Sequence, residues 1–166
     1  MKKLFPLVLI ALCILLQQCV QPPNYPIEPV IQYIGLSKTQ MKQGTGYQDS
    51  LFVTFSFTDG DGDLGYPATD PTPSVFIRDS RDSFPKPPIQ LPYVEPQGAG
   101  NGISGEITIK LPTTCCIYIN GQGSKFACED VTQIQFDTFF YYIKIRDRAG
   151  HESNEIKTEA ITLRCH

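Results

Sequence analysis

Apolar and polar residues alternate over residues 51–58, and this two-residue period constrains the fold more than any other feature of the sequence. The odd positions are leucine, valine or phenylalanine, and three of the even positions are serine or threonine. Because successive side chains of a strand point to opposite faces of its sheet, the pattern predicts a strand with one buried face. Residues 102–111 repeat the alternation, with isoleucines and a leucine expected to point inward.

The rest of the chain beyond residue 29 also favours β-structure. The 14 prolines and 13 glycines of the whole chain provide frequent turns, and no window of useful length has the 3.6-residue period of a helix. Further strands are expected at residues 30–36, 74–80, 131–147 and 155–165. The segment 131–147 predicts either two strands with a break near Asp137 or one long bent strand. We therefore predict an all-β fold, a single antiparallel β-sandwich of about seven strands.

The N-terminal segment has the composition of an export signal. Lys2 and Lys3 form a positive region, and residues 4–16 are an apolar run too short to span a bilayer as a helix. The sequence LLQQC, which ends at Cys19, resembles the lipobox of bacterial lipoproteins, in which cleavage exposes a cysteine that carries lipid. Gln18 departs from that pattern, because a small residue normally stands there. The alternatives are an ordinary secretion signal and a cysteine that merely ends an apolar run.

These features divide the chain into three parts. We expect a lipoprotein signal peptide over residues 1–18, a lipid anchor with a proline-rich tether over 19–29, and the β-sandwich domain over 30–166. Acyl chains such as palmitate on Cys19 would anchor the protein in a membrane of the bacterial cell envelope, since each buried methylene contributes about 0.8 kcal/mol. The formal charge of −3 offers no basic field for a nucleic acid, so we expect no nucleic-acid partner.

Four cysteines in the predicted domain are candidates for disulfides, because exported proteins reside where disulfides persist. They are Cys115, Cys116, Cys128 and Cys165. A bond between the two adjacent cysteines would be strained. Two connectivities therefore stay open, each joining one member of the adjacent pair to Cys128 and the other to Cys165. A metal site that includes His166 is the rival interpretation, but the spacing matches no common zinc pattern.

The stretch FTDGDGDLG, residues 57–65, places Asp59, Asp61 and Asp63 at alternate positions between glycines. This spacing lets carboxylates converge on one point, as Ca²⁺ requires with its six to eight oxygen ligands. The loop is not an EF-hand, because Leu64 stands where that loop needs glycine. The alternative is a simple glycine turn. However, a turn leaves the mutual repulsion of three carboxylates unexplained.

Further ligands would have to come from another part of the chain. Asp147 and Asn154 are the candidates, provided that the turn after residues 141–146 lies at the same end of the sandwich as the turn after residues 51–58. The sequence thus predicts a structural Ca²⁺ site formed by Asp59, Asp61, Asp63, Asp147 and Asn154.

Three stretches together resemble a group of small, mostly uncharacterised envelope lipoproteins of Bacteroidota-type bacteria. They are DSLFVTFSFTDGDGDLG, YYIKIRDRAGHESNEI and TEAITL. The segment DRAGHESN also resembles the D-x-A-G-N-x-S turn of many bacterial immunoglobulin-like and fibronectin-like domains, with His151 in place of asparagine. The resemblance implies an Ig-like or fibronectin III-like β-sandwich on a lipid anchor. Surface lipoproteins of such bacteria often carry acidic residues after the anchor cysteine. Their absence here favours the periplasmic face of the outer membrane.

These observations predict a non-catalytic envelope protein that acts as an interaction or scaffold component for an unknown envelope protein or glycan. One alternative is a carbohydrate- or peptide-binding module, because the aromatic row at residues 139–142 must point to both faces of a strand. A small hydrolase is the other. We do not expect an enzyme, because no nucleophile motif accompanies His151 or His166.

Overall fold

The computed structural model describes residues 24–46, 48–81, 86–95, 102–119, 125–128 and 134–166, and these contain strands and no helix. The all-β prediction is confirmed. None of the described residues forms a helix long and apolar enough to cross a membrane. The strands are β1 (Val30–Leu36), β2 (Gln40–Lys42), β3 (Ser50–Asp59), β4 (Val75–Asp79), β5 (Ile103–Pro112), β6 (Ile117–Ile119), β7 (Lys125–Ala127), β8 (Phe136–Phe139), β9 (Tyr141–Ile145), β10 (Ile156–Lys157) and β11 (Ile161–Arg164). The predicted signal peptide and Cys19 lie outside the described residues.

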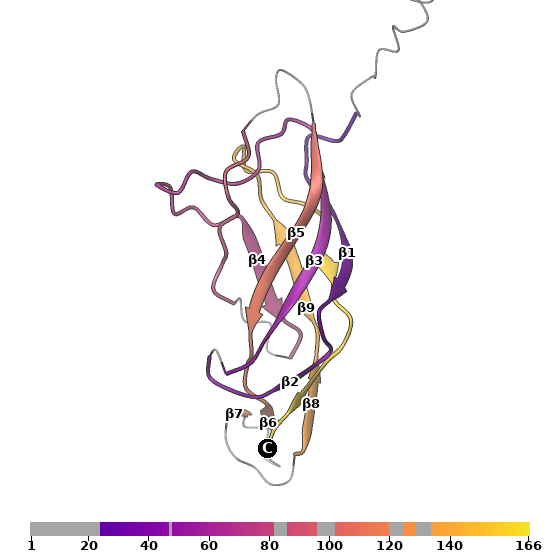
Figure 1. Ribbon diagram of the computed structural model, residues 1–166, viewed down its shortest axis with the longest axis vertical. Coiled ribbons are helices and arrows are strands. Elements are labelled where there is room, and N and C mark those ends of the chain that lie inside the picture. Colours follow the sequence, from indigo (N-terminus) through magenta and orange to yellow (C-terminus); the bar gives the residue numbers. More distant parts are fainter. Residues whose placement is uncertain (1–23, 47, 82–85, 96–101, 120–124, 129–133) are drawn as a thin grey trace, which may run out of the picture.

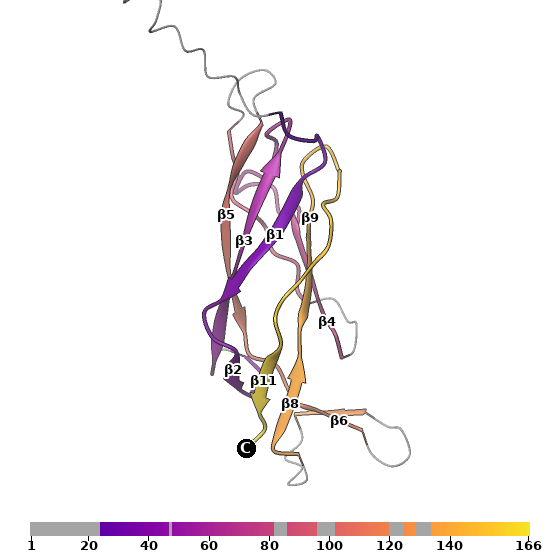
Figure 2. The same ribbon diagram turned by 90° about the vertical axis from the view of Figure 1, so that its right-hand side faces the viewer.

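Two three-stranded antiparallel sheets lie opposite each other, in the orders β1-β3-β5 and β10-β9-β4. Figure 1 and Figure 2 show them as two layers along the long axis of the molecule. A third sheet, β2-β11-β8, continues the structure at the lower end of both views, where the short hairpin β6-β7 also lies.

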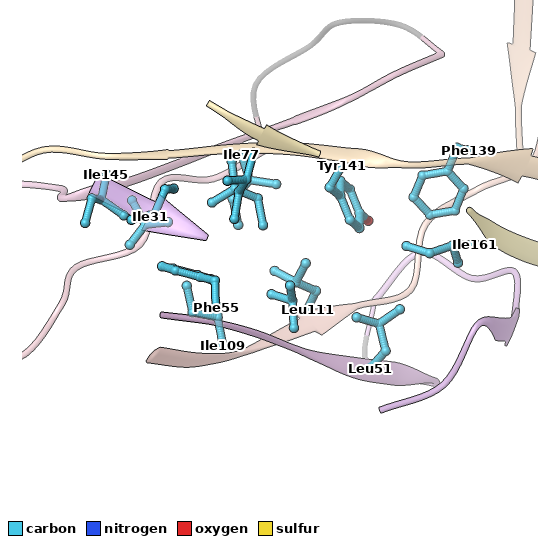
Figure 3. Packing of buried hydrophobic residues seen from close by; sticks show 14 of the residues in the cluster. Ile31, Leu51, Phe55, Ile77, Ile109, Leu111, Phe139, Tyr141, Ile145 and Ile161 are labelled. Carbon is cyan, nitrogen blue, oxygen red and sulfur yellow. The ribbon is translucent and has the colours of Figure 1, made fainter. Parts of the chain in front are cut away.

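The core fills the space between the two layers. Phe55 of β3 points from one layer toward Ile145 of β9 in the other, Leu51 of β3 lies opposite Ile161 of β11, and all four are buried (Figure 3). The inward residues of β3 are those of the sequence alternation. Burial of apolar surface at about 25 cal/mol per Å² stabilises this arrangement.

The strands differ in number and direction from the sequence prediction. The described residues form eleven strands rather than about seven, because several are short pieces at the lower end. In addition, β11 runs parallel to β2, whereas its pairing with β8 is antiparallel. A wholly antiparallel arrangement was therefore an incorrect expectation.

The predicted break near Asp137 lies instead at Phe140, between β8 and β9. Asp137 is inside β8, which pairs with β11, whereas β9 pairs with β4 and β10. The chain leaves one sheet and enters another at this point, and the amide of Phe140 donates to the hydroxyl of Ser80, 3.1 Å away. The break follows from this change of partner, which the local sequence does not encode.

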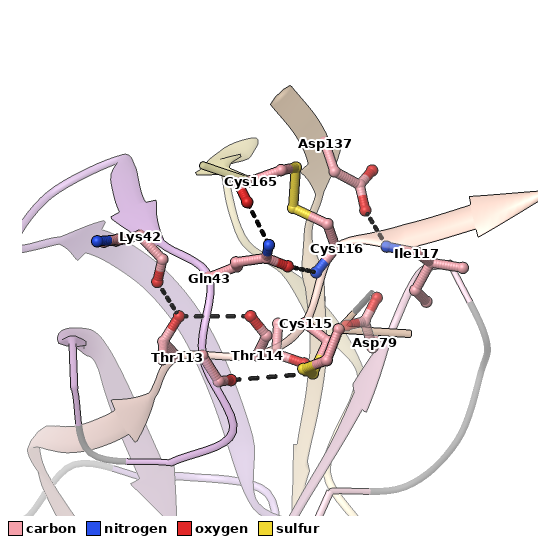
Figure 4. Close-up of a disulfide and its surroundings, with 12 residues drawn as sticks. Lys42, Gln43, Asp79, Thr113, Thr114, Cys115, Cys116, Ile117, Asp137 and Cys165 are labelled. Atoms are coloured by element: carbon pink, nitrogen blue, oxygen red, sulfur yellow. Dashed lines mark hydrogen bonds between the residues drawn. A yellow bond between two sulfur atoms is a disulfide. The ribbon is translucent and has the colours of Figure 1, made fainter. Parts of the chain in front are cut away.

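Two disulfides join Cys115 to Cys128 and Cys116 to Cys165, one of the two connectivities that the sequence left open. The second bond ties the end of β11 to the segment that follows β5 (Figure 4). Gln43 bridges the same two backbones, because its side chain donates to the carbonyl of Cys165 and accepts from the amide of Cys116. The lower end is thus held by covalent and polar links.

A buried ion-pair cluster, which the sequence did not suggest, lies beside these disulfides. Asp79 is completely buried, and the guanidinium of Arg81 binds both of its carboxylate oxygens at 2.6–3.0 Å. Arg81 also contacts Asp137 at 2.6 Å. Burial acts to raise the pKa of Asp79, but the hydrogen bonds and charge of Arg81 outweigh it and hold that pKa below its ordinary value.

Candidate metal centre

The turns that follow β3 and β9 meet at one end of the molecule, at the top of Figure 1 and Figure 2. The two strands lie in opposite layers and run in the same direction, so both deliver their C-terminal residues to this end. The amide of Arg148 donates to the carbonyl of Asp63 at 3.2 Å, and the amide of Ala149 donates to Asp63 Oδ2 at 2.9 Å. The turn after β3 and the turn after β9 therefore lie at the same end of the molecule, which is the condition on which the predicted site depended.

Four of the predicted ligands converge there. Asp59, Asp61, Asp63 and Asp147 each offer a carboxylate oxygen, and these oxygens all lie within 4.8 Å of one another. Asp59 and Asp147 are fully buried, Asp63 is partly buried and Asp61 is exposed. The group therefore extends from the protein interior to the surface, as a cation site with an entry path would.

Two carboxylate oxygens of this group are buried and have no hydrogen-bond partner within the described residues. They are Oδ1 of Asp59 and Oδ1 of Asp63. The second oxygen of Asp59 accepts from the amide of Asp63 at 2.9 Å. A buried, unsatisfied oxygen of an acidic group is costly unless it meets a proton or a cation. The orphan oxygens are thus an observation, separate from the acidic composition, that points to a ligand.

The electrostatics of the cluster agree with this geometry. Burial raises the pKa of Asp59 to about 7, and the charges of Asp61, Asp63 and Asp147 act in the same direction. Burial also raises the pKa of Asp63, with Asp147 and Asp61 adding to the effect. In the absence of a cation, Asp59 and Asp63 therefore hold protons more tightly than exposed carboxyls do. A divalent cation would reverse this preference.

The glycines of the turn have backbone roles of their own. Gly62 has φ of 70°, a region that side chains disfavour. Gly60 is needed for a different reason, because a Cβ there would lie 2.5 Å from the carbonyl oxygens of Tyr25 and Pro26. The glycines account for the path of the chain but not for the aspartates beside them.

Asn154 is not directed into the carboxylate group. Its Oδ1 accepts from the amide of Ile31 and its Nδ2 donates to the carbonyl of Ile31, both at 2.9 Å. The side chain thus pairs with the backbone of β1 as a neighbouring strand would. We therefore leave Asn154 out of the ligand set that we propose below.

His151 lies at the rim of the site, where the sequence suggested only a turn residue. Its Nδ1 is 2.8 Å from Asp147 Oδ2, and its amide donates to Asp147 Oδ1 at 2.7 Å. The hydrogen bond and charge of Asp147 raise the pKa of His151. Asp61, Asp147 and His151 form a second group with potential ligand atoms within 4.8 Å. The D-x-x-x-H spacing in one turn was the signal that could have indicated this contact.

The predicted aromatic row divides between the two faces of the strand. Phe139 and Tyr141 are buried, and their rings meet edge to face at 5.0 Å. On the outer face, the Arg78 guanidinium lies 3.9 Å from the ring centre of Tyr142. Lys157 Nζ lies 3.7 Å from that of Phe140. Cationic side chains thus occupy the outward ring faces.

No protein-family model matches the chain, and no curated protein matches it. Among solved structures, the chain is similar to the PKD domain of M14-like peptidase from Thermoplasmatales archaeon SCGC AB-540-F20, at 17% identity. The match covers 87% of this chain and 97% of that one, with a TM-score of 0.34. A likeness of this strength carries no argument about the chain.

Proposed function

We propose that this protein is a lipid-anchored, non-catalytic component of the bacterial cell envelope, whose β-domain is stabilised by a structural Ca²⁺ ion. The observation that carries the proposal is the convergence of four carboxylates with two buried oxygens that lack partners among the described residues. Such a module presents a rigid surface for interaction or scaffolding. We assign its two opposed sheets to the Ig-like class, in agreement with the D-x-A-G-type turn after β9.

Calcium is the cation that suits these ligands best. Asp59, Asp61, Asp63 and Asp147 would hold it through hard carboxylate oxygens, and water would complete its shell on the side of the exposed Asp61. Calcium tolerates irregular geometry, whereas Mg²⁺ demands a near-ideal octahedron. Bound there, the ion would offset the repulsion among the four carboxylates and join the turn after β3 to the turn after β9.

Calorimetric titration of the purified chain tests the metal site. We expect saturable binding of one Ca²⁺ per chain and weaker binding of Mg²⁺. An Asp61→Asn variant should bind Ca²⁺ more weakly, because it removes an exposed ligand with little effect on the buried part of the turn. The matched control is Asp70→Asn, which changes a nearby aspartate that lies outside the cluster. Absence of measurable Ca²⁺ binding by the parent chain would contradict the proposal.

The lipid anchor has support in the lipobox-like sequence that ends at Cys19, and it needs a separate test. Metabolic labelling with palmitate should mark the parent chain, and a Cys19→Ala variant should lack the label and leave the envelope membranes. The lack of acidic residues after Cys19 supports the periplasmic face of the outer membrane. Protease treatment of intact cells should therefore leave the protein uncut, and rapid cleavage would place it on the cell surface instead.

The two other candidate functions have less support. Sugar stacking on the outer aromatic face would have to displace Arg78 and Lys157 from the rings of Tyr142 and Phe140. A hydrolase built on the His151–Asp147 pair would need a nucleophile beside it. The nearby hydroxyl of Ser153 instead accepts from the amide of Ile145 and donates to the carbonyl of Asn154.

A further inference from the structure

β5 forms one edge of the sheet β1-β3-β5 and pairs with β3 alone among the described strands. The pairing is unbroken over ten consecutive residue pairs, from Ser50↔Pro112 to Asp59↔Ile103. Figure 1 and Figure 2 show β5 on the side of β3 that faces away from β1. The strand is thus long and regular, and no bulge or internal proline interrupts it before Pro112. Natural edge strands usually carry such protection against pairing with other chains.

The alternation of hydrogen bonds between β3 and β5 shows which backbone groups of β5 face its unpaired edge. The amide of Thr113 donates to the carbonyl of Asp49 at 2.9 Å, so odd-numbered residues of β5 direct their backbone groups toward β3. Even-numbered residues therefore direct their N–H and C=O groups outward. They are Ser104, Glu106, Thr108 and Lys110, and none of these backbone groups bonds to another described residue. Their side chains are exposed on the outer face of the sheet.

The surroundings leave this edge accessible near the end of the strand. A groove of about 370 Å³ opens between the end of β5 and the segment 86–89, with Leu111 and Tyr141 in its wall. On the inner side, Ile107 is only partly buried against the core. Ordered backbone donors, backbone acceptors and a half-covered apolar side chain thus lie along one edge.

We infer that β5 pairs antiparallel with β5 of a second copy of this chain, about a twofold axis at Thr108. In this register Thr108 faces its own counterpart, and Glu106 of each copy faces Lys110 of the other. Opposite charges directly across an antiparallel pair are stabilising, and like charges are destabilising. Ser104 faces Pro112, which lacks an N–H but still offers its carbonyl. Ile107 of one copy meets Ile109 of the other on the inner side.

The charge pattern of the edge selects this register over its neighbours. An axis at Glu106 would place two glutamates opposite each other, and an axis at Lys110 would place two lysines opposite each other. Both alternatives also shorten the overlap of the two strands. Only the axis at Thr108 pairs every outward-facing charge of β5 with its opposite, so the edge is self-complementary.

Sedimentation equilibrium of the envelope-extracted chain in density-matched detergent tests the inference. We expect a reversible dimer of the parent chain. Glu106→Lys and Lys110→Glu should each weaken association about tenfold, because each places like charges opposite each other twice. The double variant Glu106→Lys/Lys110→Glu should restore it, since the pairs then form with reversed polarity. Glu28→Lys, the same charge change on an exposed residue outside β5, should leave association unchanged.

Far-UV circular dichroism of each variant separates loss of pairing from loss of folding, and these exposed substitutions should leave the spectrum unchanged. A monomeric parent chain would overturn the inference. Equal association of the parent and both single variants, or a double variant as weak as the singles, would overturn it too. Calcium binding is measured separately, so failure here leaves the metal site unaffected.

Discussion

The side chain of Asp63 accepts a hydrogen bond of 2.9 Å from the backbone amide of Ala149 and so joins the turn after β3 to the turn after β9. The guanidinium of Arg148 strengthens the same connection, because its Nη1 donates to the carbonyls of Leu64 and Gly65 at 2.8 Å. These bonds bring the two turns together within the protein itself. A cation would therefore bind to ligands that are already close together, which lowers the cost of ordering the site.

Loss of the guanidinium of Arg81, which pairs with the fully buried Asp79, should destabilise the domain strongly. Arg81→Met leaves the fully buried carboxylate of Asp79 without its main partner, a change that typically costs about 3–5 kcal/mol. Urea unfolding followed by tyrosine fluorescence measures the effect. The double variant Asp79→Asn/Arg81→Met removes both charges and should recover part of the loss. Equal stability of Arg81→Met and the parent would contradict the role of this ion pair.

The two disulfides should contribute unequally to stability. Cys116–Cys165 has a sequence separation of 49, and Cys115–Cys128 has one of 13. Because the entropic effect grows with loop length, replacing the first pair by alanines should cost about 4 kcal/mol and replacing the second about 3 kcal/mol. Denaturant unfolding of the two double variants measures the difference. A larger loss from removal of Cys115–Cys128 would contradict this ranking.

Substitution of Asn154 should lower the stability of the domain without changing its affinity for Ca²⁺. Asn154→Leu removes both bonds to the backbone of Ile31 and should destabilise the domain by about 1–3 kcal/mol. The affinity for Ca²⁺ should stay within about twofold of the parent, because this side chain pairs with β1 and not with the ion. Titration calorimetry at a temperature where the variant is folded measures it. A large loss of affinity would restore Asn154 to the ligand set.

The metal-free protein should lose stability as the pH rises from 5 toward 7.5. The folded-state pKa of Asp59 is raised to about 7, above its ordinary value near 4. The contribution of Asp59 protonation to the free energy of unfolding is fully present below pH 4, and it is lost as the pH rises through 7. His151, whose pKa is also raised, contributes in the same direction.

Melting temperatures in EDTA at several pH values check this dependence. The decrease of melting temperature with rising pH should be smaller for Asp59→Asn, which cannot ionise at that position, while the contribution of His151 remains. In saturating Ca²⁺ the slope should flatten or reverse, because the ion favours the deprotonated carboxylates. An identical slope for the parent and Asp59→Asn in EDTA would contradict the assignment.

Local patterns were sufficient to predict the longer strands and part of the site, but not the short strands β2, β6 and β7. The alternation at residues 51–58 corresponds to β3, and the aspartate spacing indicated three of the four converging carboxylates. Asp147 was predicted only on the condition that two turns share one end, which depends on the direction of β3 and β9 in space. The pairing of Asn154 with Ile31 is a tertiary relation that no local pattern carries. The contact of His151 with Asp147 is local, and the D-x-x-x-H spacing within one turn could have indicated it.

The melting temperature of the purified chain with and without Ca²⁺ tests the central claim most directly. At Ca²⁺ concentrations about 100-fold above Kd, binding adds about 2.7 kcal/mol, which raises the melting temperature by about 5 °C or more in a domain of this size. The double variant Asp61→Asn/Asp63→Asn should lose most of this shift. If the parent and the double variant melt at the same temperature with and without Ca²⁺, the cluster is not a calcium site.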